Sequence, residues 1–298
     1  MLQAALGVLT GIFVYGWAAA VAAIRRAAPP ESPAADVRPP TGIEVGIGAL
    51  TNFFDTLGIG SFATTTALFR FLRLVPDRVI PGTLNVGHTL PTVVQAYIYT
   101  TIVKVDMLTL FALIASAVLG AWLGAGVVSR WDKRHVQIGM GSALLGAAAL
   151  MLMTQLNLFP GGGEALGVRG ARLAIGVGVN FVLGALMSLG IGLYAPCMIL
   201  ISLLGMNPTA AFPIMMGSCA FLMPVGSLKF IRERSYGFRA AAGLAIGGIP
   251  GVLLAAFIVT SMPIYWVRWL VIVVVIYTAL TMLVAGLRAP ASKGGAGS

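Results

Sequence analysis

The chain repeats a short pattern of glycines and prolines at one fixed offset. Gly58 recurs as Gly190, 132 positions later, and its neighbours recur at the same step. The matched sets are Gly46, Gly58-Ile59-Gly60, Pro76 and Pro81 in the first copy, and Gly178, Gly190-Ile191-Gly192, Pro208 and Pro213 in the second. A long internal period of this kind predicts two similar structural units. We therefore expect two half-units that fold together, with function at the place where they meet.

The composition places both units in a bilayer. Hydrophobic residues make up 58% of the 298 residues and charged residues 9%. Windows of about 20 apolar residues predict an all-α polytopic membrane protein with spans near 2–24, 79–102, 107–129, 135–157, 208–230, 238–260 and 265–287. Two longer, interrupted elements are predicted at 42–73 and 172–204. No stretch of the sequence is left over for a folded soluble domain.

These spans divide the chain into five segments. We expect an N-terminal transmembrane helix and cytoplasmic connector at 1–41, a first transport repeat at 42–157 and an external loop at 158–171. A second transport repeat follows at 172–287, and 288–298 forms a disordered tail. The first helix lies outside the repeats, either at the periphery or at a subunit contact, and a homodimer is compatible with it.

The positions of the basic residues predict the topology. Lysines and arginines gather at 25–38, 70–78, 130–134 and 229–239, which should be cytoplasmic. The element 42–73 is flanked by basic clusters at both ends, whereas 172–204 ends in the uncharged Gly205-Met206-Asn207. Each is too long for a single crossing and should fold back at its Gly-Ile-Gly break. The two repeats then have inverted topologies, each starting with a broken, re-entrant helix hairpin.

The breaks are the predicted substrate site. The second half-helices start near Ser61 and Leu193, and their free N–H groups favour an anion. Polar side chains flank both breaks. The candidate substrate-binding residues are Asn52, Gly58, Ile59, Gly60, Ser61, Asn85, Gly190, Ile191, Gly192, Leu193, Cys197 and Ser218. Close packing between helices is the structural alternative for the glycines.

Two ionisable residues are predicted inside the membrane, where charge is costly and therefore suggests function. Asp55 and His88 are the candidates for proton coupling. His88 shares one helix face with Asn85, Thr92 and Gln95, a polar stripe that lines a pathway or joins helices by hydrogen bonds. In the competing interpretation, Asp55 pairs with a hydroxyl or an arginine and only holds the hairpin together.

The glycine patterns resemble those of the TauE/SafE family of sulfite exporters, also called the toluene-sulfonate uptake permease family. The resemblance covers roughly residues 42–287. It rests on Gly46–Gly60, Gly176–Gly192, the turns at Pro76 and Pro208, and the glycines Gly120, Gly124, Gly247, Gly248 and Gly251. It implies a multi-pass carrier of the bacterial inner membrane that exports sulfite or a related anion, such as an organosulfonate or thiosulfate, with ion gradients as the driving force.

Other classes of function remain open. Cys197, Met198, Met206, Met215, Met216, Cys219 and Met223 would suit a soft-metal permease, since sulfur ligands select Cu(I). A non-transporting membrane scaffold is the third alternative. We expect no enzyme, because no catalytic signature occurs, and accordingly no catalytic residue, cofactor or structural metal site. The expected partners are the anion and membrane lipid, without nucleic acid, because the basic residues lie at segment ends.

Overall fold

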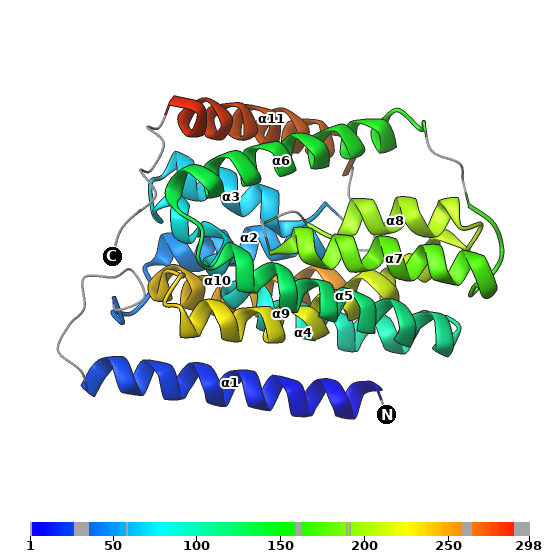
Figure 1. The fold of residues 1–298 in the computed structure, drawn as a ribbon, viewed down its shortest axis with the longest axis horizontal. Coiled ribbons are helices and arrows are strands. Elements are labelled where there is room, and N and C mark those ends of the chain that lie inside the picture. The colour runs from blue at the N-terminus through cyan, green and yellow to red at the C-terminus, as the bar shows by residue number, and fades with distance from the viewer. Residues whose placement is uncertain are drawn as a thin grey trace, which may run out of the picture.

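The computed structural model describes residues 2–26, 36–57, 59–158, 162–188, 190, 192–257 and 264–288. Across these ranges the regular structure is helical, and most helices run along the long axis of the molecule (Figure 1). Six helices are long and apolar enough to cross a membrane: Leu2–Ile24, Met107–Val128, Arg134–Gln155, Gly170–Met187, Pro208–Arg232 and Phe238–Phe257. By this criterion the chain is a multi-pass membrane protein, as its composition predicts.

After α1 (Leu2–Arg26), the elements follow one order twice. The first run is α2 (Gly42–Thr56), α3 (Ser61–Phe71), η2 (Asp77–Val79), α4 (Ile80–Ile102), α5 (Met107–Val128) and α6 (Lys133–Gln155). The second run is α7 (Gly170–Met187), α8 (Tyr194–Leu203), η3 (Pro208–Ala210), α9 (Ala211–Arg232), α10 (Phe238–Phe257) and α11 (Ile264–Arg288). The predicted helix breaks are confirmed, because α2 and α7 each end before a short second helix.

The two runs interlock rather than stand side by side. Counting α-helices only, the first helix of each run packs on the fourth helix of the other run, so α2 lies against α10 and α7 against α5. At the centre α4 packs on α9, and α6 packs on α11 along one outer face (Figure 1). Exchanging the runs leaves this set of contacts unchanged. Helices of each run are therefore packed against helices of the other run.

Glycines allow the closest of these contacts. A Cβ atom added at Gly247 on α10 would lie 1.9 Å from the Val45 carbonyl oxygen on α2. In the other helix pair, a Cβ at Gly120 on α5 would lie 1.9 Å from the Phe181 carbonyl oxygen on α7. Small residues let helix backbones approach in this way. By contrast, a Cβ atom added at Gly46 or at Gly178 would lie in open space.

The predicted cytoplasmic connections come together at one end. Arg130, after α5, forms an ion pair of 3.0 Å with Glu233, after α9. At the same end, the Gly237 N–H before α10 donates to the Thr83 hydroxyl of α4, and Arg239 pairs with Glu44 of α2 at 3.2 Å. Gln137 of α6 also donates to Asp77 at 2.7 Å. The basic segments near 70–78, 130–134 and 229–239 therefore lie at this one end of the molecule.

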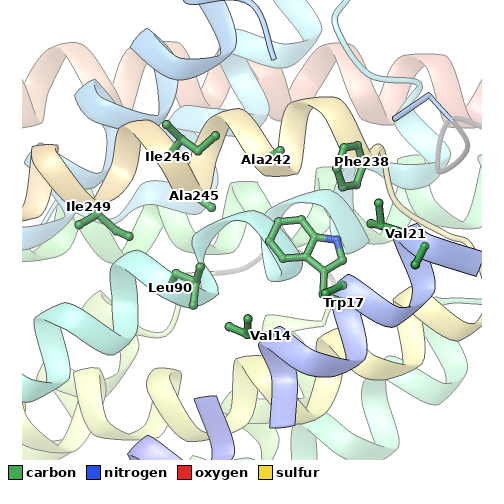
Figure 2. Close-up of a pocket in the computed structure, with 11 residues that line it drawn as sticks. Val14, Trp17, Val21, Leu90, Phe238, Ala242, Ala245, Ile246 and Ile249 are labelled. Carbon is green, nitrogen blue, oxygen red and sulfur yellow. The ribbon is translucent and has the colours of Figure 1, made fainter. Parts of the chain in front are cut away.

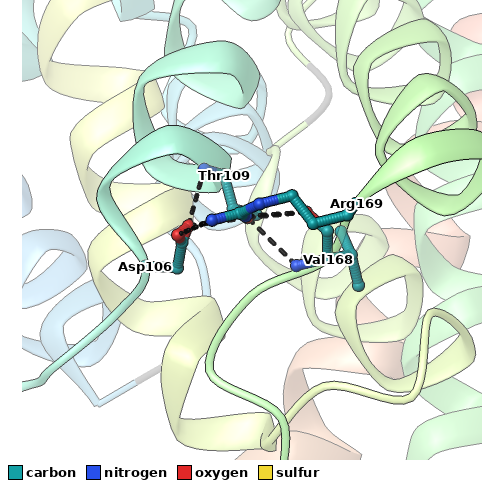
Figure 3. Close-up of polar contacts among 4 residues, drawn as sticks. All are labelled: Asp106, Thr109, Val168 and Arg169. Carbon is teal, nitrogen blue, oxygen red and sulfur yellow. Dashed lines mark hydrogen bonds and ion pairs between the residues drawn. The ribbon is translucent and has the colours of Figure 1, made fainter.

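A charged contact fixes the opposite end (Figure 3). The Arg169 guanidinium, just before α7, donates to both carboxylate oxygens of Asp106 at 2.7 and 2.8 Å. Asp106 is the N-cap of α5, where it accepts the Thr109 N–H. The Thr109 hydroxyl in turn accepts the Val168 N–H at 3.0 Å. This set of bonds joins the entry to the second run to the start of α5.

The same contact predicts a pH dependence of stability. The Arg169 guanidinium lowers the pKa of Asp106 from 3.8 to about 2. Because the folded pKa is the lower one, the stabilisation is complete above pH 4 and is lost as pH falls toward 2. We expect Asp106→Asn to lower the thermal unfolding midpoint at neutral pH. The gap to wild type should close between pH 4 and pH 2, and a constant gap across that range would contradict this origin.

Candidate functional site

The site is built around two helix breaks. The first break, residues 57–60, separates α2 from α3, and the second break, residues 188–193, separates α7 from α8. The second half-helices begin at Ser61 and Tyr194, with Leu193 as the N-cap of α8, as the sequence predicts. Two predicted site residues, Gly58 and Ile191, lie outside the described residues. Ile59 and Leu193 are buried.

The Asp55 carboxylate occupies the N-terminus of α3. Its Oδ1 accepts the backbone N–H of Ser61 at 2.6 Å, and its Oδ2 accepts the Gln95 amide at 2.9 Å. The side chain is fully buried. Over the described part of the chain, no lysine or arginine forms an ion pair with it. The N–H predicted to be free for a substrate is thus bonded to a carboxyl oxygen of the protein itself, at a helix end that favours negative charge.

Gln95 and Tyr194 connect the two runs. The Gln95 Nε2 donates to Asp55 and to the Thr56 hydroxyl, and its Oε1 accepts the Tyr194 hydroxyl at 2.7 Å. Tyr194 is the first residue of α8, and Gln95 lies on α4. The sequence placed Gln95 on a polar stripe, but neither Gln95 nor Tyr194 was predicted as a binding residue. Their contact depends on how the runs interlock.

His88 forms a separate group with Asn52 and Thr65. Its Nδ1 lies 3.0 Å from Asn52 Oδ1, and its Nε2 lies 3.0 Å from the Thr65 hydroxyl. Asn52 donates to Gly48 O, which leaves its Oδ1 as the acceptor for a proton on His88 Nδ1. The Phe62 ring stacks on the imidazole with a centroid separation of 5.6 Å. Both ring nitrogens therefore have protein partners, and Asp55 is not one of them.

The second break is apolar where the first is polar. The offset of 132 residues places Met187 opposite Asp55, Leu193 opposite Ser61, and Cys197 opposite Thr65. These three side chains are buried, and α8 has no side-chain cap at its N-terminus. Among the described residues of the second break, no carboxyl group takes the place of Asp55.

The other predicted residues have local roles. Asn85 donates to Pro81 O on its own helix. The Ser218 hydroxyl accepts from Asn180 at 3.3 Å, so this pair joins α7 to α9. Of the sulfur residues, Cys219 donates to Met187 Sδ at 3.7 Å. Within the described residues, the side-chain hydrogen bonds of Asn85 and Ser218 therefore do not reach the Asp55 carboxylate.

Backbone conformation separates the glycines of the two breaks. Gly60 has φ +90°, and in the second break Gly190 has φ +89°, whereas Gly192 lies outside this left-handed region. We expect Gly60→Ala to lower the free energy of unfolding by about 1–2 kcal/mol, because a Cβ atom strains that backbone. Gly192→Ala, with open space around its Cβ, should be nearly neutral. Thermal unfolding of the two variants would test this, and equal losses would contradict it.

An apolar groove beside α1 is of a different kind (Figure 2). A cavity of about 550 Å³ lies between α1, α4 and α10, with Trp17 and Phe238 at one end and Ile246 and Ile249 along α10. Its lining is apolar side chains throughout apart from the indole of Trp17. A lining of this composition offers an anion no charged side chain.

No family model, curated protein or solved structure matches the chain. The function must therefore be argued from the chemistry of the breaks.

Proposed function

We propose that the chain is a secondary transporter that exports sulfite or a related small sulfur-containing anion across the bacterial inner membrane by alternating access. In this proposal it is similar to the TauE/SafE family, and its two runs are inverted repeats, each starting with a re-entrant hairpin. The observation that carries the proposal is the contact of 2.6 Å between the Ser61 N–H and the Asp55 carboxylate. A carboxyl oxygen lies at a buried helix N-terminus, a position that favours an anion.

The end contacts support an inverted arrangement. The start of α2 and the end of α3 both lie near the basic end, where Glu44 meets Arg239 and Arg70 meets Asp77. The start of α7 and the end of α8 lie near the opposite end, where Arg169 meets Asp106 and the Asn207 N–H donates to Ala165 O. Each helix pair thus returns to the end at which it began. At 18 residues, α7 is also long enough to span a membrane by itself, whereas α2 has 15 residues.

The asymmetry of the breaks suggests how an anion would be carried. A second anion beside the buried Asp55 carboxylate would be repelled strongly in this low-dielectric surrounding. Protonation of Asp55 would remove the repulsion and weaken the bond to the Ser61 N–H, because a neutral carboxyl oxygen is a poorer acceptor than a carboxylate. We therefore propose that the anion moves together with a proton on Asp55. The N-terminus of α8, which has no internal carboxylate, is the second half of the site.

The direct test is flux in proteoliposomes, with and without an imposed pH gradient. We expect sulfite to enter wild-type vesicles, and a Gly60→Leu variant to lose this flux because its break cannot keep φ +90°. Thermal unfolding would show that the variant still folds. If a larger sulfonate is transported and sulfite is not, the proposed substrate changes but the proposed mechanism stands. If no tested anion shows flux, the proposal is rejected and a soft-metal permease or a scaffold is favoured.

A further inference from the structure

One chain of hydrogen bonds crosses from the second run to the first. The Tyr194 hydroxyl donates to Gln95 Oε1 at 2.7 Å, and Gln95 Nε2 donates to Asp55 Oδ2 at 2.9 Å. Asp55 Oδ1 then accepts the Ser61 N–H that opens α3. All four residues are buried. The starts of the two short helices, α8 and α3, are therefore joined through two side chains.

The Tyr194 hydroxyl supports one orientation of the Gln95 amide. A tyrosine hydroxyl that donates to Gln95 Oε1 leaves the NH₂ group of the amide pointing at Asp55 and Thr56, both of which accept. The reversed amide would place an oxygen against a carboxylate oxygen. Tyr194 thus supports the Gln95 orientation that Asp55 and Thr56 require, and so it helps to hold the carboxylate on the N-terminus of α3.

The first copy of the repeat lacks this hydroxyl. The residue 132 positions before Tyr194 is Phe62, whose ring is buried and stacks on His88. An aromatic ring therefore suits this place in both copies, and the hydroxyl is the feature specific to the second. Removing it from Tyr194 makes the second copy resemble the first, which favours a variant that folds.

We propose that the Tyr194–Gln95 hydrogen bond is a latch that holds the two breaks together in this closed arrangement and must open when the repeats rock apart. The inference rests on the proposed transport function, since it assigns one contact to the alternating-access step. Opening would separate α8 from α4 and release the bond that orients Gln95. The latch would thereby couple movement of the second run to the Asp55 carboxylate in the first.

The native thiols provide a test that needs no cargo. Cys197 lies one turn after Tyr194 on α8 and is fully buried, so a maleimide reaches it only when this region opens. In a Cys219→Ala background, Cys197 is the single thiol of the chain. We expect Tyr194→Phe to raise its labelling rate about fivefold, the usual effect of losing one buried hydrogen bond.

Tyr99→Phe is the matched control. Tyr99 lies on the same helix as Gln95, and its hydroxyl donates at 3.0 Å to Thr56 O, so that bond stays within the first run. In the Tyr99→Phe variant, Cys197 should be labelled at the same rate as in the Cys219→Ala background. Equal rates in Tyr194→Phe and the background, or the same increase in both tyrosine variants, would overturn the latch. Faster labelling specific to Tyr194→Phe would support it even if no anion is transported, which keeps this result separate from the flux assay.

Discussion

Asp55→Asn should abolish the response of anion flux to a pH gradient, so that an imposed gradient accelerates wild type at least tenfold more than the variant. The asparagine oxygen can still accept the Ser61 N–H. Its NH₂ group, however, would meet the Gln95 NH₂ group, because Tyr194 holds Gln95 Oε1. The variant has no ionisable group at this position and cannot release a proton. Flux in proteoliposomes with and without the gradient measures the effect.

Two further variants define what the result means. Asp36→Asn removes an exposed carboxylate that pairs with Arg38, so it controls for loss of an acidic residue away from the breaks. His88→Gln tests the second candidate for coupling, whose ring nitrogens contact Asn52 and Thr65 rather than Asp55. We expect it to leave the gradient response in place. If both Asp55→Asn and His88→Gln keep the wild-type pH dependence, proton coupling through these residues is wrong.

Gly247→Ala should destabilise the protein by about 3 kcal/mol, at the upper end of the usual range for overpacking. The new Cβ would lie 1.9 Å from Val45 O, so α2 and α10 would have to move apart. Because α2 leads directly into the first break, transport should be lost as well. Thermal unfolding of the purified variant measures the effect on stability, and flux measures the effect on transport.

The internal symmetry supplies controls for this prediction. Gly120→Ala introduces the same clash, 1.9 Å from Phe181 O, in the equivalent pair of α5 and α7, and should cost a similar amount. Gly46→Ala lies on α2 with nothing within 4 Å of its Cβ, and should leave stability unchanged or slightly raised. Comparable losses in Gly46→Ala and Gly247→Ala would show that helix contact is not the cause.

Much of the fold could be predicted from the sequence because it depends on local patterns. Apolar runs of helical length predicted the helix at 107–129, where the structure has Met107–Val128. The Gly-Ile-Gly pattern and its copy predicted the two breaks, and α3 begins at Ser61 as expected. The polar residues around the first break were also predicted to lie near one site, because they fall on two successive predicted elements, 42–73 and 79–102. They are Asn52, Asp55, Ser61 and His88.

The partners of these residues could not be predicted, because each depends on which helix of one run faces the other. Glycine recurrence drew attention to Gly46 and Gly178, yet the backbone contacts fall at Gly120 and Gly247, where helices from opposite runs meet. In the same way, the sequence by itself determined a duplicated, helical membrane chain with polar side chains beside both breaks. Only the tertiary structure decided that Asp55 fills the N-terminus of α3 and that Tyr194 reaches it through Gln95. Hydrophobic periodicity sets the length and burial of each helix, whereas hydrogen bonds between distant residues depend on how the packed halves are oriented.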